Sequence, residues 1–197
     1  MTKSKLSVFL AAAAISLLVA GCDNSSTPKS AGGAPAASVP ANAIYDTVAS
    51  KAAGFTVGNM MAARVVYVMF DPQCPHCGHL WQTSKPLLSQ IRMVWCPIRF
   101  SGDISVRQGA VLLSAQDPAK EMEAHERSLE AKQGGLTPPA DIPAEMMNKV
   151  KANTELMSQI GADEVPFIVY KDPRTGQSAS FKGALETEDL RKLLIGS

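Results

Sequence analysis

The sequence predicts one α/β domain, and three observations predict it. An apolar, β-branched run at residues 65–69 leads through a short turn into a Cys-Pro-His-Cys segment that can begin a helix. Residues 104–161 show helical spacing. A second apolar strand follows Pro166, and a turn at residues 172–176 joins it to another strand. With 197 residues and 46% hydrophobic content, the chain can bury one good core.

The N-terminal segment has the pattern of a secretory signal peptide. Lys3 and Lys5 precede an apolar run at residues 6–20 that is too short for a comfortable membrane span, so we expect residues 1–21 to be removed. Loss of the two lysines changes the net charge from +1 to −1 (+1 − 2). This balance does not indicate a nucleic-acid partner.

The cleavage region, Leu-Val-Ala-Gly-Cys, resembles the lipobox of bacterial lipoproteins. The resemblance implies that Cys22 is lipidated, and Asp23 resembles an inner-membrane retention signal of enterobacteria. The alternative is an ordinary signal peptide that leaves Cys22 as a free thiol. Residues 22–42 are rich in Ser, Ala, Gly and Pro, so we expect a flexible tether to a domain over 43–197, on the periplasmic side of the inner membrane.

Short elements are expected before the Cys-Pro-His-Cys segment. Residues 43–49 can form a helix, and residues 55–57 an edge strand. The strand at residues 64–70 is almost wholly apolar, which suits a central strand buried on both faces. This strand ends at the edge of the sheet where open α/β proteins bind their ligands, so the residues that follow it lie at that edge.

The segment itself carries the predicted chemistry. Cys74 caps a helix that has Pro75 at its first position. The helix dipole and the free first-turn N–H groups stabilise a thiolate at Cys74, and CxxC thiols reach pKa values of about 3.5 to 7.5. His76 adds a proton donor or a positive charge between Cys74 and Cys77. Both effects favour the reduced form, which makes the disulfide a better oxidant.

A zinc half-site and a structural disulfide are the alternatives for this pair. A structural zinc site needs four ligands, and the sequence offers no second CxxC motif, only Cys96 and three histidines. A disulfide between adjacent helical turns closes so short a loop that it stabilises little. The preceding strand and the following helix therefore favour redox chemistry.

The chain after the motif continues as helix, strand and helical insertion. Pro86 should kink the first helix, because it lacks the N–H that would bond to the carbonyl four residues earlier. Residues 93–100 predict a strand that contains Cys96. Burial favours a spectator thiol there, and the alternative is a resolving or regulatory role. In the insertion at about 104–161, Asp117 caps a helix that runs to about residue 132.

A second landmark is the strand at residues 164–170. Pro166 opens this strand, and X-Pro bonds are nearly the only peptide bonds that adopt the cis form. A strand at residues 177–182 and a helix at residues 186–195 close the domain.

In this order, the elements resemble a thioredoxin fold, which implies a central mixed sheet with a helical insertion between the CxxC unit and the cis-proline strand. The catalytic domain of the periplasmic disulfide isomerase family DsbC/DsbG, and especially the DsbG type, resembles residues 55–197. The resemblance rests on residues 65–68, 71–77, 117–120, 156–157 and 161–166.

The resemblance implies a role for each motif residue. Cys74 is the attacking thiolate, Cys77 is the resolving thiol, and Pro166 is a cis-proline beside the disulfide, where an extended substrate strand could pair with the backbone. Asp71 either relays a proton from Cys77 or stabilises the turn, and the sequence favours neither role.

Three features depart from this family. Residues 23–54 are too few for the dimerisation domain of the V-shaped isomerases, so we expect a monomer. Pro75 with His76, and Val165 before Pro166, resemble the oxidase DsbA, whereas the isomerases usually have Thr before that proline. The soluble enzymes also lack the lipid anchor expected here.

The sequence therefore predicts a membrane-anchored periplasmic thiol-disulfide oxidoreductase that needs no cofactor or metal. Its substrates are protein thiols, disulfides or sulfenic acids, and the membrane redox partner that resets the pair decides the direction of electron flow. Two other classes stay open. One is a chaperone-like binding module, and the other is a copper or zinc handling protein that uses Cys74, Cys77 and His79.

Overall fold

The computed structural model describes residues 39–196. The predicted signal peptide, the predicted lipidation site Cys22, Asp23 and most of the predicted tether lie outside these residues. Within the described part, no helix is both long and apolar enough to cross a bilayer.

The last residues of the predicted tether already contact the domain. The Val39 N–H donates to the Gln159 carbonyl at 3.2 Å, and the Ser178 hydroxyl donates to the Ala41 carbonyl at 3.0 Å. A 3₁₀ turn, η1 (Ala41–Ala43), then leads into α1 (Ile44–Lys51). Residues 39–43 therefore contact both α5 (Ala144–Gln159) and β5 (Ser178–Lys182).

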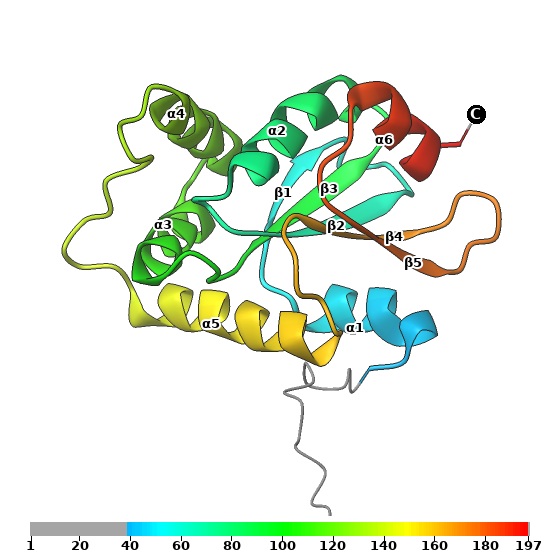
Figure 1. Ribbon diagram of the computed structural model, residues 1–197, viewed down its shortest axis with the longest axis horizontal. Coiled ribbons are helices and arrows are strands. Elements are labelled where there is room, and N and C mark those ends of the chain that lie inside the picture. The colour runs from blue at the N-terminus through cyan, green and yellow to red at the C-terminus, as the bar shows by residue number, and fades with distance from the viewer. Residues whose placement is uncertain (1–38, 197) are drawn as a thin grey trace, which may run out of the picture. The chain divides into compact units, whose positions relative to one another are not determined.

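A five-stranded mixed sheet forms the centre of the molecule (Figure 1). Its strand order is β1-β3-β2-β4-β5, and only β2 and β3 are parallel. The strands are β1 (Phe55–Gly58), β2 (Val65–Phe70), β3 (Arg92–Pro97), β4 (Phe167–Lys171) and β5 (Ser178–Lys182). This sheet confirms the predicted fold class and places β2 at its centre.

Helices cover both faces of the sheet (Figure 1). The face that carries Val68 and Trp95 packs against α2 (Pro75–Ser84) and α6 (Thr187–Leu194). The opposite face, which carries Met69, packs against α1 and α5 (Ala144–Gln159). Because both faces are covered, the run of apolar residues in β2 has no solvent-facing side, as expected for a central strand.

Proline explains how α2 ends. The α-helix stops at Ser84, and a 3₁₀ turn, η2 (Lys85–Leu87), follows with Pro86 at its centre. A proline cannot supply the N–H of the next α-helical hydrogen bond, so the α-helical ladder ends just before it. The interruption predicted at Pro86 is therefore a change of helix type.

The third strand is shorter than the predicted span of residues 93–100. It ends at Pro97, and the Ile98 N–H makes one further bond to the Phe70 carbonyl. The N–H groups of Phe100 and Ser101 then bond to the carboxylate of Asp71 and not to a neighbouring strand. A side chain distant in sequence thus ends the ladder, and Phe100 is left 59% exposed.

The predicted helical insertion contains three helices, α3 (Asp103–Ser114), α4 (Pro118–Glu130) and α5. The Asp117 carboxylate accepts a hydrogen bond from the Lys120 N–H at 3.1 Å, which is the expected cap of α4. The α4 helix lies beside α2, because Trp81 and Lys85 both donate to the Glu123 carboxylate. The insertion is therefore packed against the helix that starts at Cys74.

Candidate active site

Cys74 is held at the N-terminus of α2 by the turn that follows β2. Its N–H donates to the Asp71 carbonyl at 3.0 Å, and Pro75 occupies the first helical position. The Cys74 carbonyl accepts from the N–H groups of Cys77 (3.0 Å) and Gly78 (3.2 Å). The sequence therefore places this sulfur where the first-turn N–H groups point toward it.

The two motif sulfurs differ in exposure and in pKa. Cys74 is half-buried, and its pKa is lowered to about 6, chiefly because the Cys77 side chain hydrogen-bonds to it. Cys77 is fully buried, and burial raises its pKa far above the ordinary range, with its bond to Cys74 acting in the same direction. Both are free thiols here. At neutral pH this arrangement gives one thiolate and one protonated thiol.

His76 contributes less than the sequence indicates. Its side chain is exposed, and its charge is the smallest of the effects that set the Cys74 pKa. The hydrogen bond from Cys77 is the largest effect. The partner sulfur, and not the residue between the two, is thus the main stabiliser of the thiolate.

The strand that begins with Pro166 approaches the same sulfur. The Val165–Pro166 bond is cis, and the Cys74 thiol lies 3.7 Å from the Val165 carbonyl oxygen. This contact joins positions that are 91 residues apart in sequence. The sheet makes it possible, since β2 and β4 are antiparallel neighbours and the start of β4 lies beside the end of β2.

Asp71 is completely buried below the turn and accepts four hydrogen bonds. One carboxylate oxygen accepts from the Gln73 N–H (2.7 Å) and the Ser105 hydroxyl (2.9 Å). The other accepts from the N–H groups of Phe100 (2.6 Å) and Ser101 (2.7 Å). Of the two roles the sequence left open, this geometry supports stabilisation of the turn.

The helical insertion also holds the turn, through residues that sequence reasoning missed. His125 is buried; its Nδ1 accepts from the Leu136 N–H at 3.0 Å, so its Nε2 carries the proton and donates to the Pro72 carbonyl at 2.7 Å. Burial lowers the pKa of His125, which keeps the ring neutral. Gly135 has φ +84°, and the ring leaves no room there for a Cβ atom.

A pair of glutamines makes a second connection. The Gln73 amide donates to the Gln108 side-chain oxygen at 2.6 Å, and the Gln108 amide donates to the carbonyls of Gly134 (2.8 Å) and Leu136 (2.9 Å). No local sequence signal marks Gln108 or His125, because their partners are 26 to 53 residues away or are backbone groups.

Glu126 is another residue that the sequence did not indicate. It lies on α4, is 4% exposed, and places its carboxyl group against the backbone of Gly78 in α2. Burial is the main cause that raises its pKa to about 8, and the negative charges of Glu130 and Cys74 add to the shift.

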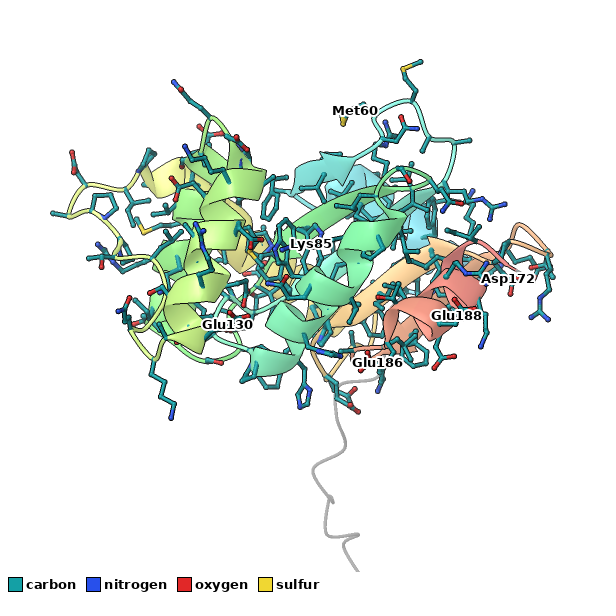
Figure 2. The ribbon with its side chains drawn as sticks, turned by 90° about the horizontal axis from the view of Figure 1, so that it is seen from above. Met60, Lys85, Glu130, Asp172, Glu186 and Glu188 are labelled. Atoms are coloured by element: carbon teal, nitrogen blue, oxygen red, sulfur yellow. The ribbon has the colours of Figure 1, made fainter. Side chains whose placement is uncertain are left out.

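Cys96 and His79 lie apart from the sulfur pair. Cys96 is fully buried in the core on the α5 side of the sheet, whereas Cys77 belongs to the core on the α2 side, and burial raises the pKa of Cys96 to about 12. The exposed His79 ring lies 3.0 Å from the carboxylate of Glu186, and Figure 2 labels that glutamate. Within residues 39–196, no group of three or more His, Cys, Asp or Glu side chains could hold a metal ion.

The mixed sheet, the dithiol at the start of α2 and the cis-proline beside it define a thioredoxin-like protein with a CxxC site. No family model matches the chain. It is 31% identical over 139 residues to the thiol:disulfide interchange protein DsbG of Pseudomonas aeruginosa, covering 70% of this chain and 53% of that protein. It is also 31% identical over 118 residues to DsbG of Escherichia coli K12, covering 57% and 46%.

These relatives confirm the resemblance to DsbG, and the chain spans about half the length of each. Solved structures confirm the thioredoxin-like fold. A periplasmic thioredoxin-like protein from Salmonella enterica serovar Typhimurium has a TM-score of 0.62 at 17% identity, with 79% of this chain and 96% of that chain covered. The catalytic domain of Proteus mirabilis ScsC gives 0.57 at 19% identity, with coverages of 76% and 91%. Pseudomonas aeruginosa DsbA2 gives 0.58 at 18%, with coverages of 70% and 90%.

Proposed function

We propose that this chain is a thiol-disulfide oxidoreductase that exchanges disulfides with protein substrates through Cys74 and Cys77. The difference between the two thiols carries the proposal. With a pKa of about 6, Cys74 is about 90% thiolate at pH 7. Cys77 is buried and protonated, so only one sulfur attacks an incoming substrate. The two relatives from Pseudomonas aeruginosa and Escherichia coli are thiol:disulfide interchange proteins, which supports the same chemistry.

The reducing direction has two steps. The Cys74 thiolate attacks one sulfur of a substrate disulfide, forms a mixed disulfide and releases the other sulfur as a thiolate. Cys77 then gives up its proton and attacks the Cys74 sulfur, which forms the intramolecular disulfide and releases the second substrate sulfur. The side-chain hydrogen bond between the two cysteines keeps the second nucleophile beside its target. The oxidising direction is the reverse.

A substrate sulfenic acid follows a similar course. The Cys74 thiolate attacks the sulfenic sulfur and displaces hydroxide, which leaves a mixed disulfide. Cys77 resolves that disulfide, and its proton converts the hydroxide to water. The products are the reduced substrate thiolate, one water molecule and the disulfide form of the pair.

The backbone beside the pair supports binding of an extended substrate segment. The Val165 carbonyl lies next to the Cys74 sulfur. The residue after Val165 is Pro166, which has no backbone N–H. A substrate segment on either side of its cysteine can pair with main chain at this point, as in β-strand addition. Such pairing is independent of substrate side chains and suits proteins of varied sequence.

The Cys74 pKa also bears on the direction of exchange. Active-site pKa values near 7 in thioredoxin and 3.5 in DsbA accompany potentials of about −270 and −120 mV. A pKa of about 6 lies between these two values, so we expect a potential between about −270 and −120 mV. The partner that resets the pair then decides the direction of exchange.

The proposed location is the periplasm, with Cys22 lipidated and anchored at the inner membrane, and a membrane redox partner that resets the pair. The lipobox-like residues 18–22 and Asp23 support the anchor, and mass spectrometry of the purified chain tests it. The proposed monomer is tested by sedimentation of the full chain in detergent.

Single-cysteine variants test the proposed activity. In an assay that follows reduction of insulin disulfides, Cys74→Ser should abolish turnover. Cys77→Ser should accumulate mixed disulfides at Cys74, because the resolving thiol is missing. Cys96→Ser is the matched control and should retain turnover, since that thiol lies in the other core. Equal turnover by the Cys74→Ser and Cys96→Ser variants would exclude this chemistry and favour a binding role for the domain.

A further inference from the structure

Glu126 lies one helical turn from Cys74 without touching it. Its carboxyl group contacts the α2 backbone at Gly78, where an added Cβ atom would lie 2.2 Å from Oε2. Gly78 is the residue whose N–H donates to the Cys74 carbonyl. The side chain is 4% exposed. A glycine in the first turns of α2 thus makes room for a buried carboxyl group beside the reactive end of the helix.

The Glu126 side chain makes no hydrogen bond or ion pair within residues 39–196. Its carboxyl group lies against Gly78 and borders a cavity of about 380 Å³ between α2 and α4, which Gln82 and Leu129 also line. Burial of most of this side chain without a partner disfavours the charged form of the carboxyl group, so the site favours a bound proton.

The charges around Glu126 reinforce this preference. Glu123 and Glu130 face it from α4, Cys74 and His79 from α2, and Lys85 from η2. Figure 2 shows Lys85 and Glu130 at the junction of α2 and α4. Lys85 is paired with Glu123 at 2.5 Å, and His79 is paired with Glu186 at 3.0 Å. Lys85 and His79 are thus engaged elsewhere, while a thiolate at Cys74 adds a negative charge.

We propose that Glu126 is a redox-linked proton site for the Cys74–Cys77 pair, which binds its proton more tightly while Cys74 is a thiolate and less tightly once the disulfide forms. This inference rests on the proposed function. The disulfide carries no charge at Cys74, so the repulsion that favours the protonated carboxyl group disappears on oxidation. By reciprocity, an ionised Glu126 destabilises the thiolate and thus the reduced form.

The charge balance distinguishes two stoichiometries. At a pH between the Glu126 pKa values of the reduced and oxidised forms, the thiolate, the Cys77 thiol and the protonated carboxyl group become a disulfide and a carboxylate, and oxidation releases two electrons and two protons. Without a titrating group at position 126, oxidation releases two electrons and only the proton of Cys77. Each additional proton changes the redox equilibrium constant by up to tenfold per pH unit.

The test compares the full chain with its Glu126→Gln variant in glutathione redox buffers from pH 6 to pH 9. Ionisation of glutathione itself cancels in the ratio of the two equilibrium constants. Between pH 6 and pH 9, we expect the constant for reduction of the wild-type pair to fall at least threefold relative to the variant. Glu121→Gln removes a carboxylate from the first turn of α4 that is not one of the charges named around Glu126, and the ratio of its equilibrium constant to that of wild type should stay within twofold.

One outcome would overturn the inference: both proteins form the disulfide, and the ratio of their equilibrium constants for reduction, wild type over Glu126→Gln, stays the same from pH 6 to pH 9. That outcome would leave the proposed function intact. A wild-type chain that forms no disulfide at any pH would instead overturn the proposed function.

A second measurement needs no variant. Carbon-detected NMR titration of Glu126 in the reduced and oxidised wild-type protein should give a higher pKa in the reduced form. Equal pKa values in the two forms would overturn the inference.

Discussion

The Cys74 sulfur and the Val165 carbonyl oxygen lie 3.7 Å apart, although 91 residues separate them in sequence. This contact brings the N-terminus of α2 and the start of β4 together at one edge of the sheet. It leaves Cys74 half-buried and open to an incoming sulfur, while Cys77 stays covered. The proposed exchange chemistry depends on this difference in access.

The pH profile of Cys74 alkylation tests what stabilises the thiolate. In the reduced wild-type protein, the rate of reaction with iodoacetamide should rise with pH through a midpoint near pH 6, since only the thiolate reacts. Cys77→Ala removes the hydrogen bond that contributes most, so the midpoint should move upward by about one unit or more. His76→Gln should move it less. A larger shift in the His76 variant would show that the helix dipole and His76 dominate, as the sequence indicated.

Asp71→Asn should destabilise the domain. An Asn side chain has one acceptor oxygen where the carboxylate has two, so two of the four donors lose their acceptor. We expect a loss of roughly 2 to 3 kcal/mol in the free energy of unfolding, measured by urea denaturation. Ser105→Ala removes one of these bonds and should cost roughly 1 kcal/mol. Equal costs for the two variants would contradict the assigned role of Asp71.

His125 should make the free energy of unfolding depend on pH in the acid range. Its folded-state pKa is lowered by burial, so below its ordinary value of about 6.5 the unfolded chain binds the proton more readily. The stability that this ring contributes is complete above that value and falls as the pH is lowered, by up to about 1.4 kcal/mol per unit. His125→Gln should remove this part of the slope in urea titrations between pH 7 and pH 5. An unchanged slope would indicate that the ring protonates freely in the folded protein.

Glu126 should act in the opposite pH direction. Its folded-state pKa is raised, so stability is complete below the unfolded value near 4.5 and is lost as the pH rises through about 8. Relative to wild type, the Glu126→Gln variant should therefore gain roughly 1 to 2 kcal/mol in unfolding free energy between pH 6 and pH 9. The gain should be larger in the reduced protein, where the Cys74 thiolate is present. A stability difference that does not change with pH would show that the carboxyl group is not buried in solution.

Local signals explain how much of this fold could be predicted from the sequence. Pro75 after Cys74 marks a helix start, Asp117 with Pro118 marks another, and the apolar run of β2 marks a buried strand. Each of these depends on neighbouring residues, and the structure has each element where it was predicted.

Contacts between distant elements explain what the sequence could not show. Strand β3 ends early because the Asp71 carboxylate, 29 residues before Phe100, captures the next N–H groups. His125, Gln108 and Glu126 reach the active-site turn because α3 and α4 pack beside it at a particular rotation. Helical periodicity predicts a buried face, but it does not predict which residue of the chain that face meets.

The most direct test of the central claim is the reduction potential of the full chain, measured by glutathione equilibration with alkylation and peptide mapping at each ratio. We predict a single Cys74–Cys77 disulfide, a free Cys96 at every ratio, and a midpoint between about −270 and −120 mV. A pair that never oxidises, a disulfide that includes Cys96, or a midpoint below about −300 mV, typical of structural disulfides, would contradict the account.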